Sequence, residues 1–240
     1  ALYIYLDSAF LLTLFTLLFL KKKYMTLLHG LIGGLIYFIV DYGYFYLWLG
    51  TREVDGMDPC LLLIWLSMSY GSTNFIWMWL FSKRDNDLLE WILLIVTWWI
   101  SCPFISQTFG GSFATISIRR GTTAYHGIMG VWLIAGYGIL IVHNLFAKTK
   151  INLWWVLLTG VSVQFFWEFS LLLGGIRQFD LHNLVVNSLL ETNMGAPFIY
   201  LYTTLYYKHF NDDFSKKSPA TARLEKPSKA GKKGKPSKEE

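Results

Sequence analysis

Seven mostly apolar stretches of about 20 residues follow one another along this chain, separated by short polar breaks. A helix rises about 1.5 Å per residue, so about 20 apolar residues cross the hydrocarbon core of a bilayer. We therefore predict an all-α integral membrane protein in which residues 1–214 form one seven-helix transmembrane bundle. The predicted spans are residues 2–20, 26–49, 60–81, 88–106, 122–146, 153–174 and 181–207. No small-residue cleavage site follows the first span, so we expect it to be retained rather than removed as a signal peptide.

Lysine and arginine fall unevenly on the two sides of the predicted bundle. Cytosolic loops of membrane proteins carry an excess of these residues. If the N-terminus lies outside, every inner break contains lysine, whereas the outer breaks contain only Arg52, Arg119, Arg120 and Arg177. We therefore predict an outside N-terminus and a cytosolic C-terminus, in the plasma membrane or an endomembrane.

The basic character of the chain belongs to its C-terminal end. Residues 215–240 contain nine basic and three acidic residues, which accounts for the formal net charge of +5. This segment has no apolar periodicity and contains three prolines, a composition typical of disorder. We predict a disordered cytosolic tail that contacts anionic lipid headgroups, and we expect no nucleic-acid partner.

Three carboxylates interrupt the predicted spans at a similar depth. Counting residues from the span ends places Asp41, Glu168 and Glu191 on the order of 10–15 Å below the outer surface. A carboxylate in hydrocarbon is costly unless it is paired, protonated or hydrated, so such residues predict a functional site. We therefore predict a cavity that opens to the extracytosolic side, with these three acids as catalytic candidates. Gly195 and Pro197, which follow Glu191, predict a kink in the last span.

Helical spacing groups the polar side chains of the last two spans. Gln164 and Glu168 are four residues apart, as are Asn187 and Glu191, so each pair projects from one helix face. We expect these four side chains to meet between the two helices, with Arg177 reaching one carboxylate from the connecting loop. The alternative is that they form structural hydrogen bonds between helices.

Aromatic residues exceed what two interfacial belts require, since the chain contains 11 Trp, 14 Tyr and 18 Phe. Aromatic faces stabilise cations where water is excluded, so we expect a small apolar or cationic substrate. The expected binding residues are Asn74, Gln164, Asn187, Asn193, Tyr70, Trp167 and Arg177. We expect neither a cofactor nor a metal, because no pair of His residues and neither of the two cysteines has metal-ligand spacing.

A short motif in the sixth and seventh spans resembles a known family. Trp167-Glu168, followed after a polar break by Asn193-x-Gly195, is similar to the segment that carries the catalytic glutamate in the small seven-span membrane terpene cyclases of fungal meroterpenoid and indole-diterpene pathways. The resemblance implies acid catalysis on an isoprenoid substrate, with Glu168 as the proton donor. The motif order differs, because that family has its Trp-Glu segment in the N-terminal half and a second acid before a late Ser-Tyr-Gly. Here the Ser-Tyr-Gly, at residues 69–71, comes early and a serine takes the place of the acid.

Two other classes of function remain open. A faint internal repeat, His-Gly followed by Tyr-Gly, recurs at residues 29–43 and 126–138, and inverted repeats are typical of transporters. In that case the chain is a proton- or cation-coupled carrier in which Glu168 and Glu191 bind the coupling ion. The third class is a non-catalytic subunit of a membrane complex or a homo-oligomer. A closed, dry pocket favours the enzyme, whereas water paths to both sides favour the carrier.

Overall fold

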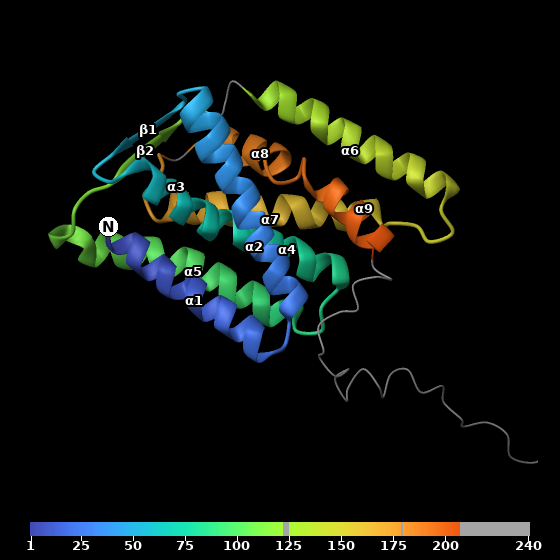
Figure 1. The fold of residues 1–240 in the computed structure, drawn as a ribbon, viewed down its shortest axis with the longest axis horizontal. Helices are drawn as coiled ribbons and strands as arrows, with labels where there is room; N and C mark the ends of the chain where they lie inside the picture. The colour runs from blue at the N-terminus through green and yellow to red at the C-terminus, as the bar shows by residue number, and fades with distance from the viewer. Residues whose placement is uncertain (122–124, 179, 207–240) are drawn as a thin grey trace, which may run out of the picture.

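The protein is described by a computed structural model that covers residues 1–121, 125–178 and 180–206. The fold is mostly helical, with a two-stranded ribbon at one end of the bundle (Figure 1). The helical elements are α1 (Leu2–Leu20), α2 (Tyr24–Phe38), η1 (Ile39–Trp48), α3 (Pro59–Leu66), η2 (Ser67–Gly71), α4 (Ser72–Lys83), α5 (Leu88–Phe109), η3 (Gly110–Ser112), α6 (His126–Phe146), α7 (Leu153–Leu173), α8 (Leu181–Leu190) and α9 (Ala196–Tyr206). The predicted basic tail, residues 215–240, lies outside the described residues.

Five helices are long and apolar enough to cross a membrane, in agreement with the predicted multi-pass membrane protein. They are Leu2–Leu20, Tyr24–Trp48, Leu88–Ser112, His126–Phe146 and Leu153–Leu173. Their outer surfaces are apolar; on α6, for example, Ile134, Leu145 and Phe146 are 75%, 73% and 85% exposed. Apolar surfaces of this kind are unusual for a soluble monomer and suit contact with lipid.

The other two predicted spans are helical but interrupted. The segment predicted at residues 60–81 consists of α3, η2 and α4 end to end, and η2 is a short π-helix. The last segment breaks between α8 and α9, where residues 191–195 form turns, so the interruption predicted from Gly195 and Pro197 is confirmed. Pro197 lies in the first turn of α9, where an N–H group would have no helical partner.

The ribbon is an addition to the expected all-α bundle. Strand β1 (Arg52–Asp55) pairs antiparallel with β2 (Ser117–Arg120), and the register places Arg52 opposite Arg120. Gly56 leaves β1 with φ +83°, and a Cβ there would lie 2.4 Å from the carbonyl oxygen of Thr115. Only glycine fits such a close approach in this backbone conformation. The ribbon therefore brings together two cations from loops that are distant in sequence.

The core lies between α1, α4, α5 and α7 and is rich in tryptophan. Trp77 of α4 stacks on Trp99 of α5 with their ring centroids 6.0 Å apart, and both side chains are buried. Helix α2 approaches α4 closely, since a Cβ at Gly33 would lie 2.3 Å from Phe75. These contacts fix α2 and α4 as two neighbouring walls of the site described below.

Ion pairs join the helix connections at the end of the bundle opposite the ribbon (Figure 1). Lys21 lies 2.7 Å from Asp87, and Lys23 lies 2.5 Å from Asp85, so the α1–α2 turn is linked to the α4–α5 turn. The Lys23 and Asp85 side chains are only 6% and 11% exposed. Each of these two lysines has one carboxylate partner, and the charges balance pair by pair.

Candidate functional site

A buried glutamine organises the polar groups inside the bundle. The carbonyl oxygen of Gln164, on α7, accepts hydrogen bonds from the hydroxyl groups of Tyr70 and Thr192. Its amide nitrogen donates to Oε1 of Glu168 at 3.2 Å and to Oε2 of Glu191 at 2.8 Å. Two acceptor sites and two donor hydrogens are thus all used. The predicted meeting of Gln164, Glu168 and Glu191 is confirmed.

Local structure explains why these groups meet. Gln164 and Glu168 lie about one turn apart on α7 and share a face. Glu191 and Thr192 follow directly after α8, in the turn that leads to α9, so they approach α7 from a non-helical segment. Asn187 stays on α8 and does not join this network; its side chain lines a separate cavity.

Arg177 closes one side of the network. Its Nη1 lies 2.6 Å from Oε2 of Glu168, which confirms that the loop arginine reaches back to a carboxylate. Glu168 is 2% exposed, and its other oxygen accepts from Gln164. Glu168 lines neither of the two cavities described below. Both oxygens of this carboxylate are therefore occupied by protein donors.

Asp41, in η1, binds two arginines of the ribbon. Arg52 donates to Oδ1 of Asp41 from Nε at 3.1 Å and from Nη2 at 2.8 Å, and Nη2 of Arg120 donates to Oδ2 at 3.1 Å. The Arg52 guanidinium also lies over the ring of Phe45, 4.2 Å from its centroid, which adds a cation–π contact. Two cations facing one carboxylate leave this cluster with one excess positive charge.

Both ribbon arginines stay charged. Burial lowers the pKa of the Arg52 guanidinium, and the charge of Arg120 lowers it further, although Asp41 acts in the opposite direction. Burial also acts to lower the pKa of Arg120, but the carboxylates of Asp41 and Glu191 outweigh it and the pKa is raised. Because arginine is protonated far above neutral pH in proteins, both side chains are cations at neutral pH.

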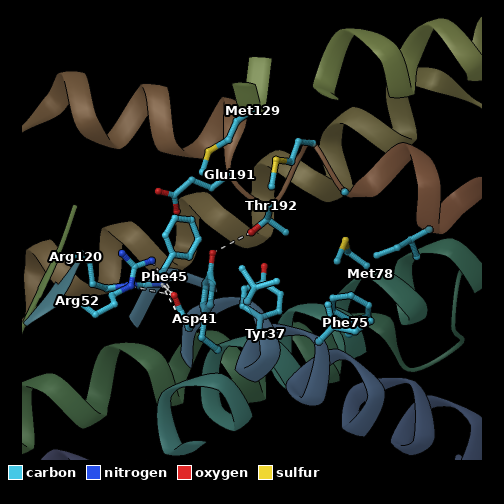
Figure 2. A pocket seen from close by; sticks show the side chains of 16 residues that line it. Tyr37, Asp41, Phe45, Arg52, Phe75, Met78, Arg120, Met129, Glu191 and Thr192 are labelled. Atoms are coloured by element: carbon cyan, nitrogen blue, oxygen red, sulfur yellow. Dashed lines mark hydrogen bonds and ion pairs between the residues drawn. The ribbon is translucent and has the colours of Figure 1, made fainter. Parts of the chain in front are cut away.

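A first cavity of about 270 Å³ lies beside these groups. Figure 2 shows the cluster of Asp41, Arg52 and Arg120 on one side of it and Phe75 and Met78 on the other. It is lined by Ile36, Tyr37, Val40, Asp41, Phe45, Arg52, Tyr70, Phe75, Met78, Arg120, Met129, Glu191, Thr192, Met194, Gly195 and Ile199. The first cavity is therefore amphipathic, with charged groups at one end and apolar and thioether side chains at the other.

The first cavity reaches the flank of the bundle. Ile36 and Val40, on α2 and η1, line it and are 44% and 41% exposed. These two elements together form a helix long and apolar enough to cross a membrane. On the neighbouring side, Met129 of α6 lines the cavity. A ligand with an apolar chain can therefore lie partly in the cavity and partly against the apolar outer surface.

A second cavity of about 460 Å³ lies next to the ribbon. It is lined by Ala1, Tyr3, Ile4, Leu62, Trp65, Leu66, Ile116, Ser117, Ile118, Arg119, Arg120, Trp167, Leu171, Ile176, Arg177, Asn183 and Asn187. Three residues predicted to bind substrate, Trp167, Arg177 and Asn187, are found here. Arg120 lines both cavities.

The remaining predicted residues divide between the network and a different contact. Asn74 donates from Nδ2 to the hydroxyl of Thr192 at 3.2 Å, and the ring of Tyr70 lies 5.0 Å from that of Trp167. Asn193, in contrast, lines neither cavity. Its Oδ1 accepts from the Tyr137 hydroxyl at 2.9 Å, which links the α8–α9 turn to α6.

Three charged residues near the site were not singled out from the sequence. Arg52 and Arg120 lie in predicted loops, and only the alternating Ser-Ile-Arg-Arg at residues 117–120 hints at a strand. Asp7 lies within the first apolar run and is 1% exposed, with no hydrogen-bond partner at Oδ2. Its presence inside a predicted span was the signal that could have found it.

Glu191 differs from the other acids in its surroundings. It lines the first cavity and is half-buried, and its Oε2 accepts from Gln164. Among the described residues, no lysine or arginine lies within 4.0 Å of it, and its Oε1 accepts no hydrogen bond. A carboxyl group held in this way can exchange a proton with a molecule in the cavity.

Comparisons with known proteins return no match to a family model, to a curated protein or to a solved structure. In the described ranges, no group of three or more His, Cys, Asp or Glu side chains is arranged to hold a metal ion, and Cys60 and Cys102 are free thiols. The chemistry that the cavity itself can perform therefore carries the functional inference.

Proposed function

We propose that this chain is a multi-pass membrane enzyme that binds a lipid or isoprenoid substrate in the first cavity and acts on it by acid catalysis. The observation that carries the proposal is the placement of Glu191, a carboxyl group with one amide donor and no cationic partner among the described residues, on the wall of an amphipathic cavity. An apolar cavity that contains a few converging polar groups is the usual form of a small-molecule site.

The proposal assigns the proton to Glu191 rather than to Glu168. The resemblance to membrane terpene cyclases implied Glu168, but both oxygens of that residue are occupied by Arg177 and Gln164. We assign Glu168 a positioning role, in which it helps to orient the amide of Gln164 toward Glu191. Protonation of a substrate olefin or epoxide by Glu191 would leave a carboxylate, which takes a proton back when the product alkene forms.

The aromatic lining suits a positive charge that develops during such a reaction. Tyr37, Phe45, Tyr70 and Phe75 line the first cavity. Their π-faces stabilise a cation most strongly where water is excluded. The terpene-cyclase-like form of the proposal, in which a carbocation is guided along the cavity, is supported by this lining together with the acid.

The proposed topology has seven spans, with the N-terminus outside and the C-terminus in the cytosol. The segments α3–η2–α4 and α8–α9 then join the five longer helices as spans. Support comes from the charged turns, because Lys21, Lys23 and Arg84 lie at the end opposite the ribbon (Figure 1). That end suits the cytosol, where positive loops are preferred.

The test compares two variants, each with one glutamate replaced by glutamine. Membranes that contain the wild type, Glu191→Gln or Glu168→Gln are incubated with isoprenoid alcohols, with isoprenoid monophosphates and with the terminal epoxides of both, and products are measured by mass spectrometry. We expect Glu191→Gln to abolish turnover, because a glutamine cannot donate the proton, and Glu168→Gln to reduce it. The matched control is Glu90→Gln, an exposed glutamate of α5 that should keep full turnover. Full turnover by Glu191→Gln would contradict the proposal.

A carrier is the second candidate, and the position of Arg120 favours it. Because this side chain lines both cavities, its movement would connect the ribbon end with the centre of the bundle. Alternating access requires such a gate beside a binding site. Proton uptake by liposomes on addition of the substrate, without any chemical change in that substrate, would select the carrier over the enzyme.

A further inference from the structure

Two donor groups in the Asp41 cluster have no hydrogen-bond partner within residues 1–121, 125–178 and 180–206. Nη1 of Arg52 and Nε of Arg120 are buried and unpartnered, and both residues line the first cavity. The Arg52 side chain is 0% exposed, so water outside the protein does not reach it. Buried donors of a charged group are rarely left unsatisfied, because the loss of hydration is not recovered.

None of the residues that the structure describes supplies the missing acceptor. Both oxygens of Asp41 already accept from the two arginines. Glu191 lines the same cavity but is held by Gln164 and lies beyond ion-pair distance of Arg52 and Arg120. The cluster thus keeps one excess positive charge and two N–H groups without an acceptor among the described residues, on two arginines that line a cavity of about 270 Å³.

We propose that the first cavity selects an amphiphile with an anionic head, a phosphate monoester or a carboxylate, which Arg52 and Arg120 bind. Guanidinium groups recognise these anions through paired, charge-assisted hydrogen bonds. The inference deepens the proposed function, because it names the substrate class of the same site and rests on that site being the substrate site. It replaces the sequence-based expectation of a cationic substrate, which two arginines would repel.

The shape of the first cavity orients such a ligand. The arginines occupy one end, and the opposite end is lined by Phe75 and Met78 (Figure 2). Cavities that enclose a drug-sized ligand measure roughly 300–1,000 Å³, so about 270 Å³ holds a head and the first part of a chain. The rest of the chain leaves between the exposed side chains of Ile36 and Val40 toward the apolar flank.

Binding of four probes to the full chain in phosphatidylcholine nanodiscs tests the inference. The probes are dodecyl phosphate, dodecanol, dodecyltrimethylammonium and inorganic phosphate, and tryptophan fluorescence reports binding. We expect dodecyl phosphate to bind at least about tenfold more tightly than each of the others. Equal or tighter binding of the alcohol or the ammonium compound would overturn the anionic head. Equal binding of inorganic phosphate would overturn the amphiphile, because a free anion would then be the ligand.

Neighbouring arginines provide the matched variants. Arg52→Gln and Arg120→Gln should each weaken dodecyl phosphate at least about tenfold, whereas Arg119→Gln should leave it unchanged, because Arg119 lies outside the first cavity. Arg52→Lys keeps the charge and serves as the folded comparison if Arg52→Gln does not fold. Equal weakening by all three glutamine variants would overturn the inference. Glu191→Gln should keep dodecyl phosphate binding even while turnover is lost, so failure of catalysis and failure of head recognition are distinguished.

Discussion

Charged side chains are paired differently at the two ends of the bundle. At the end opposite the ribbon, Lys23 and Asp85 form one pair 2.5 Å apart, and Lys21 and Asp87 form another 2.7 Å apart. At the ribbon end, Asp41 faces both Arg52 and Arg120, and two guanidinium N–H groups have no acceptor in the described part of the chain. A cavity lies beside the second cluster, and neither described cavity is lined by the first pair. Balanced charges join helices, whereas an unbalanced cluster beside a cavity is suited to a ligand.

The same contrast separates the two acids around Gln164. Glu168 is closed in by Arg177 and the amide, whereas Glu191 shares the amide and turns to the cavity. The difference comes from the backbone: Glu168 lies within α7, but Glu191 lies in the break between α8 and α9. An interruption of a membrane helix is tolerated where it lines a cavity, so the break and the open acid belong together.

The largest expected effect comes from breaking the ribbon-end cluster. Asp41→Asn leaves the buried Arg52 and the half-buried Arg120 without a carboxylate, and we expect it to lower the free energy of unfolding by about 3–5 kcal/mol. Asp85→Asn should lower it by only about 1–3 kcal/mol, because the single flexible Lys23 can reach water. Unfolding by SDS titration in mixed micelles measures both. Equal losses in the two variants would contradict the proposed difference between the two ends. Dodecyl phosphate should restore part of the lost free energy of unfolding in Asp41→Asn but not in Asp85→Asn.

The next effect concerns the amide that the two acids share. Gln164→Leu removes the partner of four buried or half-buried groups at once, and we expect a loss of roughly 2–4 kcal/mol in the free energy of unfolding. Turnover should fall as well, since Glu191 loses its only hydrogen-bond donor among the described residues. Gln107→Leu, on the exposed side of α5, is the matched control and should change neither quantity. A Gln164→Leu variant that is both stable and fully active would show that the network does not position Glu191.

The smallest effect is expected at the exposed pair of Lys21 and Asp87. Their side chains are 47% and 39% exposed, so solvent screens the attraction. We expect Lys21→Gln to change the free energy of unfolding by less than about 1 kcal/mol. The measurement is the same SDS titration, at low and at high salt. A loss as large as that of Asp85→Asn would mean that the whole lysine end acts as one network rather than as separate pairs.

Much of the carboxylate network was accessible from local spacing. Gln164 and Glu168 share a face because four residues make about one turn, and Gly195 with Pro197 marked the break that places Glu191. Arg177 follows α7 by only a few residues, so its contact with Glu168 could also be predicted from their closeness in sequence. The five long apolar helices follow from hydrophobicity alone.

The cluster of Asp41, Arg52 and Arg120 could not be predicted from sequence spacing. Arg52 meets Arg120 through a strand pairing between two loops that are distant in sequence, and four-residue strands carry a weak signal. Asn193, expected to bind substrate, lies in the break between α8 and α9 and accepts from Tyr137 instead of lining a cavity. Asp7 was overlooked inside an apolar run, although its burial is now clear. Long-range pairing and helix breaks therefore set the limit of local reasoning here.

One wall of the first cavity is held by little protein. Helix α6 contributes Met129 to that wall and lies at the edge of the bundle (Figure 1). Only 11% of the residues in its most apolar stretch are buried. It packs mainly against α8 and α9, so most of its lateral surface is left for contact with lipid. The width of the first cavity then depends on the acyl-chain length and the thickness of the bilayer. The host membrane would act as an adjustable component of the site, and the same chain would differ in ligand exchange between thin and thick bilayers.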